Sequence, residues 1–303
     1  LYHNRGDGTF EDDAPVLGLT KPQRSFPCWF WDFDNDGNLD IYASTYWPHV
    51  SFTAASFLGK PSPAELACLY KGDGRGGFTD VARAQNLLRI DMPMGSNFGD
   101  LDNDGWLDFY LGTGTPAYDG LVPNRLYKNR GGTGFADVTA AAGMGHLQKG
   151  HAVAFADLDE DGDQDVFEEM GGAFPGDAFG NALYENPGFG NHWIKLRLSG
   201  TRSNRSAIGA RIRVDVEDAG VKRSIHRVVG TGGSFGSNPL RAEIGIGKAE
   251  RALRVEVYWP TSDTRQTFEG LLADRSYEIV EGDATIHQTS VAPLPFKEAP
   301  AAQ

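Results

Sequence analysis

The sequence has few cysteines, a deficit of basic residues and no long apolar segment. Only 2 of the 303 residues are cysteine, which excludes a fold held together by many disulfides. Lys and Arg number 28 against 41 Asp and Glu, and because contact with a phosphate backbone needs a basic surface, we expect no nucleic-acid partner. No apolar run approaches the roughly 18 residues of a membrane helix, so no membrane span is predicted.

Glycine and proline, by contrast, are abundant. The 39 glycines and 16 prolines indicate many turns in a chain long enough to bury a large core. The segments between these turns are short and rich in aromatic and β-branched residues, which favour strands. The composition therefore predicts an all-β protein.

Acidic residues recur in three copies of one nine-residue pattern, Asp-x-Asp-x-Asp-Gly-x-x-Asp. The copies cover residues 32–40, 100–108 and 157–165. A calcium ion takes roughly six to eight oxygen ligands, whereas magnesium demands near-octahedral geometry and keeps its waters. The pattern therefore predicts about three bound calcium ions.

Each copy supplies carboxylates at positions 1, 3, 5 and 9 and a backbone carbonyl at position 7, and the glycine at position 6 permits the sharp turn. The predicted metal ligands are Asp32, Asp34, Asp36, Asn38, Asp40, Asp100, Asp102, Asp104, Trp106, Asp108, Asp157, Asp159, Asp161, Asp163 and Asp165. An EF-hand is the alternative, since Glu168 stands at position 12 of the third copy. The other copies have Ala43 and Leu111 there, and their flanks favour strands over helices.

The repeat extends beyond the acidic pattern. Tyr2, Tyr70 and Tyr127 each precede a copy by 30 residues, and Phe10, Phe78 and Phe135 each follow the tyrosine by 8. Gly- and Asn-rich turns separate each tyrosine from its phenylalanine, which is typical of hairpins. A repeat of this size, built from short strands, predicts β-propeller blades.

These repeats resemble the FG-GAP/VCBS repeats of integrin-α-like propellers through the motifs at residues 69–72, 77–81 and 97–105. The resemblance implies that the metal loops are hairpins on one rim and that ligands meet a different face. Three units cover residues 1–190, whereas a closed propeller needs about four to eight blades. We therefore expect further blades or a partner chain to complete the partial propeller.

After Tyr184 the pattern changes to alternating apolar and polar residues, as in Ile212, Val214 and Val216. This alternation predicts a small antiparallel β-sandwich over residues 191–283, and the Pro- and Ala-rich residues 284–303 are expected to be a flexible tail. Residues 190–193, 203–211, 245–247 and 257–260 resemble the ASPIC/UnbV domain. With the repeats, the chain resembles the cartilage-acidic-protein (CRTAC)-type family, which implies an architecture and a compartment but no reaction.

The two cysteines, Cys28 and Cys68, lie within one repeat and are a candidate disulfide, with two buried thiols as the alternative. A disulfide would fit an exported protein. Calcium is also far more abundant outside the cell than in the cytosol. We therefore expect an extracellular or periplasmic location.

Aromatic residues gather in the segments that follow each acidic copy. The candidate partner-binding residues are Tyr46, Trp47, His49, Phe52, Phe57, Tyr118 and Phe174. Because they occupy one place per repeat, we expect them on one rim, where they bind a protein or carbohydrate partner. Packing beneath long loops is the alternative.

The sequence thus predicts an exported calcium-binding interaction or scaffold module without catalysis. One alternative is an enzyme that acts on carbohydrate or a natural product through the aromatic loops, and another is a structural subunit of an extracellular assembly. Residues 232–236 match Gly-x-Ser-x-Gly, but Asn238, Pro239 and a predicted strand follow, where a nucleophile elbow requires a helix.

Overall fold

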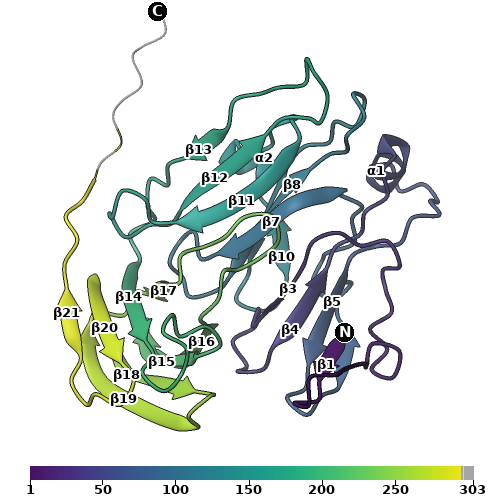
Figure 1. Cartoon of the computed structure of the whole chain (residues 1–303). Coiled ribbons are helices and arrows are strands. Elements are labelled where there is room, and N and C mark those ends of the chain that lie inside the picture. The colour runs from purple at the N-terminus through teal and green to yellow at the C-terminus, as the bar shows by residue number, and fades with distance from the viewer. Residues whose placement is uncertain (295, 297–303) are drawn as a thin grey trace, which may run out of the picture.

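The computed structural model describes residues 1–294 and 296, which form an all-β fold with two short helices (Figure 1). Five sheets of three or four strands and one two-stranded hairpin account for the strands. The sheets have a propeller-like arrangement in which the last two share one core. The predicted fold class, a partial propeller followed by a β-sandwich, is confirmed.

Three sheets, each an antiparallel meander in chain order, form the blades. Blade 1 contains β3 (Cys28–Trp31), β4 (Asp40–Ala43), β5 (Cys68–Gly72) and β6 (Phe78–Asp80). Blade 2 contains β7 (Pro93–Gly99), β8 (Asp108–Thr113), β9 (Arg125–Asn129) and β10 (Phe135–Asp137). Blade 3 contains β11 (Gly150–Ala156), β12 (Asp165–Met170) and β13 (Ala182–Tyr184). Each acidic copy connects the first two strands of its blade.

The blades pack through aromatic and aliphatic side chains at their junctions. Between blades 1 and 2, Phe135 stacks on Trp31 with ring centroids 5.7 Å apart, and Phe109 meets Phe135 edge-on at 5.2 Å. Tyr110, Val153 and Val166 belong to a smaller core between blades 2 and 3. The repeated phenylalanine of the sequence is therefore a core residue of the first junction.

The remaining hairpin, β1 (Tyr2–Asn4) with β2 (Phe10–Asp12), carries the first copy of the repeated Tyr and Phe. Here both side chains are exposed, Tyr2 by 73% and Phe10 by 63%. Their counterparts Tyr127 and Phe135 are almost fully buried. In the described chain, this hairpin lacks the neighbouring strands that cover its counterparts.

Two sheets form the C-terminal part and enclose a single apolar core. One contains β17 (Ala242–Gly247), β14 (His192–Ser199), β20 (Arg275–Val280) and β21 (His287–Thr289), and the other contains β16 (Val221–Val228), β15 (Arg211–Asp218), β18 (Arg251–Trp259) and β19 (Thr264–Leu272). One pair departs from the expected antiparallel order, because β14 and β20 are parallel. The alternation of apolar and polar residues indicates a half-buried strand, but it does not indicate whether the neighbouring strand is parallel or antiparallel.

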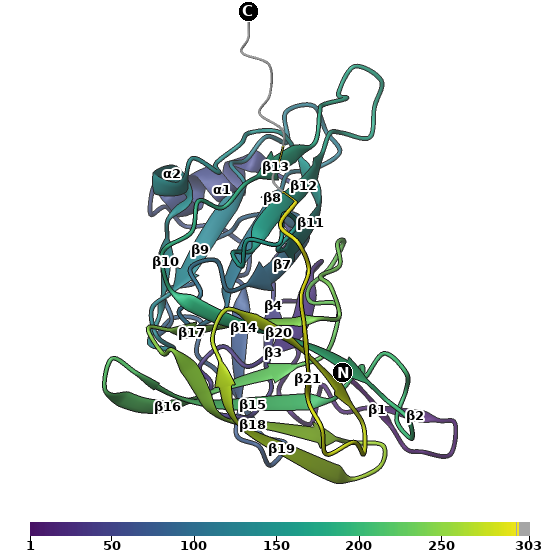
Figure 2. The ribbon, with the colours of Figure 1, turned by 90° about the vertical axis from the view of Figure 1, so that its left-hand side faces the viewer.

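The first part of the predicted tail is not a flexible segment, because β21 pairs with β20 and Leu294 N donates to Asp159 O. The last part of that tail, residues 295 and 297–303, lies outside the described residues. Figure 2 shows the C-terminal sheets beneath the blades and the yellow end of the chain rising past blade 3.

The helices are α1 (Val50–Phe57) and α2 (Thr139–Ala142). The 11 residues that lengthen the first repeat therefore fold in part as α1 rather than as an open loop. Within the described part of the chain, no helix combines the length and apolar character needed to cross a bilayer.

Candidate metal centres

The first aspartate of each acidic loop closes the loop with its own carboxylate. Asp32 accepts hydrogen bonds from Asp36 N at 3.1 Å and Gly37 N at 2.8 Å, and Asp157 does the same from Asp161 N and Gly162 N. Gly37 has a φ of +86°, a backbone conformation that residues other than glycine rarely adopt. The expected glycine turn is thus present.

This folding gathers three carboxylates in each loop, with one oxygen from each lying within 4.8 Å of the others. The three clusters are Asp32, Asp34 and Asp40; Asp100, Asp102 and Asp104; and Asp157, Asp159 and Asp161. These are nine of the predicted ligands. Asp36, Asp108 and Asp165 stand outside these groups. The predicted ligation by Asn38, Trp106 and Asp163 through their backbone carbonyls stays a prediction.

Several oxygens in the clusters are buried without a hydrogen-bond donor. Oδ1 of Asp34, Asp100 and Asp102 has no partner in the described chain. A buried carboxylate oxygen without a donor is costly, and a cation would satisfy it. All the clustered groups are oxygen donors of the kind that calcium prefers. The residues present therefore fit a hard divalent cation.

The carboxylate of the last aspartate of each loop links the start of the loop to the end of the third strand of its blade by hydrogen bonds. Asp108 accepts from Leu101 N at 3.2 Å and from Asn129 N at 2.8 Å. Asp165 is bonded in the same way to Leu158 N at 3.1 Å and Asn186 N at 2.9 Å. Position 9 thus has a structural role that the ligand pattern alone did not indicate.

Crowding and burial make these carboxyl groups hard to ionise. Burial, with smaller contributions from neighbouring aspartates, raises the pKa of Asp32 and of Asp100 to about 7. Burial raises the pKa of Asp163 to about 6, and the nearby Asp161 carboxylate adds to the rise. Positive charge in the loops would lower these pKa values.

A lysine lies against each cluster. Lys71 contacts Asp34 and Asp36, and Lys128 contacts Asp102 and Asp104. Both follow the repeated tyrosine directly, so the Tyr-Lys pair at residues 70–71 and 127–128 was an available signal in the sequence. In the third repeat that place holds Glu185, and Lys195 of β14 contacts Asp157 instead.

The C-terminal strands cover the loops of blades 1 and 2. Arg223 donates to Asp104 O at 2.6 Å. Arg227 donates to Gly105 O at 3.2 Å and to Asp100 Oδ2 at 3.4 Å. His226 N donates to Asn35 Oδ1 at 3.0 Å. The guanidinium groups of Arg223 and Arg227 thus bring positive charge to an acidic loop far away in the sequence, and the backbone of His226 contacts the first loop.

The third loop is covered by β14 and β17. A Cβ on Gly162 would lie 1.7 Å from Trp193 Nε1, so only glycine fits beneath this ring. Lys195 also lies 3.0 Å from Glu160, which pairs with Arg241 at 2.7 Å. No sequence pattern indicated that these residues meet the acidic loops.

The predicted partner-binding residues fall into two groups. Trp47 packs against Phe52 at a centroid distance of 5.7 Å, and His49 packs against Phe52 at 5.5 Å, next to α1. Phe57 lies beneath Arg125 of β9 and beneath Arg89, which precedes blade 2. Tyr46 stacks near Phe26 rather than on this group.

The second group contains Tyr118 and Phe174, whose rings are 5.6 Å apart. Both are about half exposed, and Tyr118 donates from its hydroxyl to Pro175 O at 2.8 Å. Figure 1 shows α1 and the loop between β12 and β13 toward the upper end of the blades, away from the acidic loops. The expectation that these aromatic residues bind a partner stays a prediction.

The candidate disulfide between Cys28 and Cys68 is wrong, because both cysteines are free. Each pairs with Ala43 from opposite sides of β4. Two strand spacings separate their Cα atoms by roughly 9 to 10 Å, beyond the reach of a disulfide. Sharing a repeat did not place the two cysteines on adjacent strands.

Comparison with known proteins agrees with this architecture. Residues 200–286 match the family described as ASPIC and UnbV. Cartilage acidic protein 1 from Homo sapiens is 28% identical over 267 residues, which is 86% of this chain and 37% of that protein. The Mus musculus protein of the same name is 27% identical over 266 residues, 86% of this chain and 38% of that protein.

Cartilage acidic protein 1 from Xenopus tropicalis is 26% identical over 279 residues, which is 89% of this chain and 39% of that protein. The chain thus spans between 37% and 39% of the length of these relatives. The alignment covers the blades as well as the C-terminal sheets. This chain therefore contains an ASPIC and UnbV domain and is a distant homologue of cartilage acidic protein 1 over most of its length.

Proposed function

We propose that this protein is an exported, calcium-binding β-propeller that acts as an interaction or scaffold module. The observation that carries the proposal is the repetition of one carboxylate cluster three times, with buried oxygens that have no donor. Calcium would hold each loop closed from within, while the lysines and arginines around it neutralise the remaining charge. An exported protein meets calcium concentrations that fill sites of modest affinity.

Two exposed surfaces support the proposal that a partner binds. Tyr118 and Phe174 present exposed aromatic area, and their amphipathic or apolar rings suit contact with a protein or a carbohydrate. The exposed Tyr2 and Phe10 of the β1–β2 hairpin occupy places that are buried in blade 2. We infer that strands from a longer chain or from a partner cover this hairpin, because exposed strand edges attract pairing.

Calorimetric titration of the metal-free protein with calcium tests the proposal. We expect about three ions per chain and a higher melting temperature in calcium than in chelator, because an ion at 100 times its Kd stabilises the native state by about 2.7 kcal/mol. Asp102→Ala should remove one ion from the stoichiometry. Asp73→Ala, in a turn outside the loops, is the control.

Equal melting temperatures in calcium and in chelator, with no heat of binding, would refute calcium binding. Normal binding by Asp102→Ala would refute the assignment of the second cluster. The calcium-binding and partner-binding parts of the proposal can be separated. The double variant Tyr118→Ala/Phe174→Ala should leave the calcium-dependent rise in melting temperature unchanged.

A further inference from the structure

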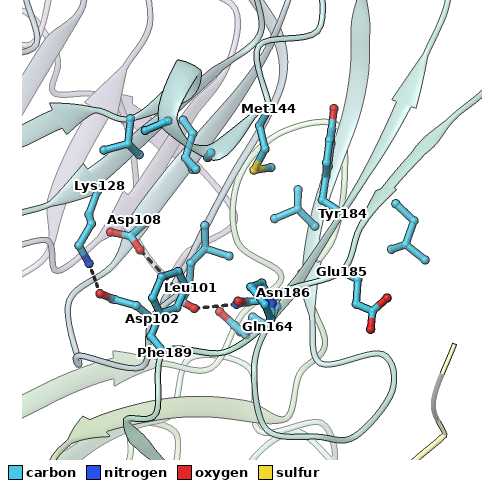
Figure 3. Close-up of a pocket in the computed structure, with 17 residues that line it drawn as sticks. Leu101, Asp102, Asp108, Lys128, Met144, Gln164, Tyr184, Glu185, Asn186 and Phe189 are labelled. Atoms are coloured by element: carbon cyan, nitrogen blue, oxygen red, sulfur yellow. Dashed lines mark hydrogen bonds and ion pairs between the residues drawn. The ribbon is translucent and has the colours of Figure 1, made fainter.

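A cavity between blades 2 and 3 follows from the repeat. It measures about 740 Å³ and has mainly apolar walls (Figure 3). At the junction of blades 1 and 2, the equivalent space is filled by Phe135, which touches Phe33 and Phe109. In the third repeat, the place eight residues after Tyr184 holds His192, which begins β14 instead. This cavity is therefore a gap in the repeat.

A second cavity, of about 350 Å³, has a charged lining. It lies between the first acidic loop, at Gly37, and the sheet formed by β16, β15, β18 and β19. The polar side chains of its wall are those of Arg211, Arg213, His226, Glu256, Tyr258 and Arg265. Three arginines thus line this cavity against one carboxylate.

Strand pairing gathers these side chains on the face of the sheet that points away from the C-terminal core. Arg211 and Arg213 are two residues apart on β15 and share this face, while Ile212 between them is buried in the core. Arg211 lies opposite Tyr258 of β18, and Tyr258 lies opposite Arg265 of β19. Three adjacent strands therefore hold the arginines, as a preformed site requires.

The carboxylates beside the cavity leave much of its positive charge unpaired. Glu256 accepts from Arg265 at 2.7 Å and is shared with a second arginine, from its own strand. Asp215 accepts from Nε of Arg213 at 2.8 Å. Among the residues that the structure describes, Arg211 has no ion pair. Like charges on neighbouring strands repel, so an anion in the cavity would stabilise this face of the sheet.

His226 forms the wall beneath the first acidic loop. A Cβ on Gly37 would lie 3.2 Å from Cε1 of His226, so the loop packs directly on the ring. Burial holds the pKa of His226 below its ordinary value, and the positive charges of Arg213 and Arg227 lower it further. At neutral pH the imidazole is therefore uncharged, and the positive charge of the wall comes from the arginines.

We propose that this arginine cavity binds a doubly charged oxyanion, the sulfate or phosphate group of a small ligand. A guanidinium group presents a planar fork of N–H donors that matches the oxygens of such a group and forms charge-assisted hydrogen bonds. The volume lies within the range of small-molecule sites, roughly 300 to 1,000 Å³. The cavity is separate from the carboxylate clusters and from Tyr118 and Phe174, so the inference goes beyond the proposed function.

Calorimetric titration of the full chain with sodium sulfate, at constant ionic strength with chloride as the balancing anion, tests the proposal. Arg211→Gln should raise the dissociation constant about tenfold, because it removes charge-assisted hydrogen bonds. Arg211→Lys should raise it by about threefold, since lysine keeps the charge but not the fork. Arg251→Gln, at an exposed position of β18 outside the cavity, is the matched control and should bind sulfate normally.

Equal weakening in Arg211→Gln and Arg251→Gln would overturn the proposal, because the general field of the sheet would then account for the binding. Glucose 6-sulfate and glucose 6-phosphate, titrated in the same way, distinguish the sources of the group. Tighter binding of either ester than of sulfate supports a sugar-borne group in the cavity, and equal binding supports a free ion there. No saturable binding of any of the three would overturn the proposal.

Discussion

Glu281, at the end of β20, shows how a single carboxylate can fix the conformation of a turn. It accepts hydrogen bonds from the backbone N–H groups of Thr201, Arg202 and Ser203, between 2.7 and 2.8 Å, and from two serine hydroxyls. Burial opposes its ionisation, but these bonds, that from Ser262 foremost, outweigh burial and hold its pKa at about 2. In the acidic loops, burial raises the pKa of Asp32, Asp40 and Asp100, which is the opposite shift.

Replacing Glu281 should therefore remove a pH-dependent stabilisation. The folded pKa lies below the unfolded value of 4.5, so the carboxylate stabilises the fold above about pH 4.5, and this contribution is lost as the pH falls toward 2. We expect Glu281→Gln to lower the free energy of unfolding by about 2 to 3 kcal/mol at pH 7. Urea unfolding at pH 7 and pH 3 measures the difference.

Glu269→Gln, at an exposed position of β19, is the control and should change the unfolding free energy little at either pH. A Glu281→Gln penalty that is as large at pH 3 as at pH 7 would show that the shape of the side chain matters, and not its charge.

At the scale of the element, each acidic loop is a hairpin whose stability depends on what neutralises it. With raised pKa values, the metal-free loops bind more protons in the folded than in the unfolded state between about pH 4 and pH 7. Their folded state is therefore destabilised as the pH rises through this range. Protons and calcium compete for the same oxygens.

The calcium-induced rise in melting temperature should consequently be larger at pH 8 than at pH 6. The metal-free protein, kept so by a chelator that still binds calcium tightly at pH 6, should melt at a higher temperature at pH 6 than at pH 8. Calorimetry in calcium and in chelator at both pH values measures the two shifts. An equal or larger calcium effect at pH 6 would contradict competition with protons.

The acidic loops could be predicted from the sequence because all their determinants are local. The carboxylates, Gly37 and its equivalents and the flanking strands lie within a few residues of each other. Helix α1 was missed because its sequence has no clear helical periodicity and no capping side chain. Its contacts are tertiary ones, through Phe52 with Trp47 and through Phe57 with Arg125.

At the scale of the whole molecule, the C-terminal sheets are joined to the loops through close backbone contacts. Gly247 N donates to Asn103 O at 2.9 Å, and a Cβ on Gly245 would lie 2.3 Å from the Asn103 backbone. We expect Gly245→Ala to lower the unfolding free energy by about 1 to 3 kcal/mol, as overpacking does, and to weaken calcium binding at the second loop. Calorimetry and calcium titration measure the two effects.

Gly230→Ala is the matched control, because nothing lies within 4 Å of a Cβ at that position. If Gly245→Ala melted and bound calcium like Gly230→Ala, the loops and the C-terminal sheets would be energetically independent.

Contacts of this kind, between segments far apart in the chain, could not be predicted from the sequence. The boundary near residue 190 follows from a change of pattern along the chain, whereas the docking of Trp193 on Gly162 depends on two surfaces that fit in three dimensions. The misplaced disulfide has the same cause, since Cys28 and Cys68 are separated by β4, and strand order rather than spacing decides which residues touch.

The contact between Asn35 and His226 joins residues 191 positions apart, and its consequence concerns the order of folding. The first acidic loop emerges from the ribosome long before the strand that covers it. Non-local contacts of this length slow folding, because the chain loses much entropy before they form. During synthesis, the early loops must therefore persist as open hairpins, and an ion captured from the surroundings is the only neutralising partner beyond their own lysines until β16 arrives.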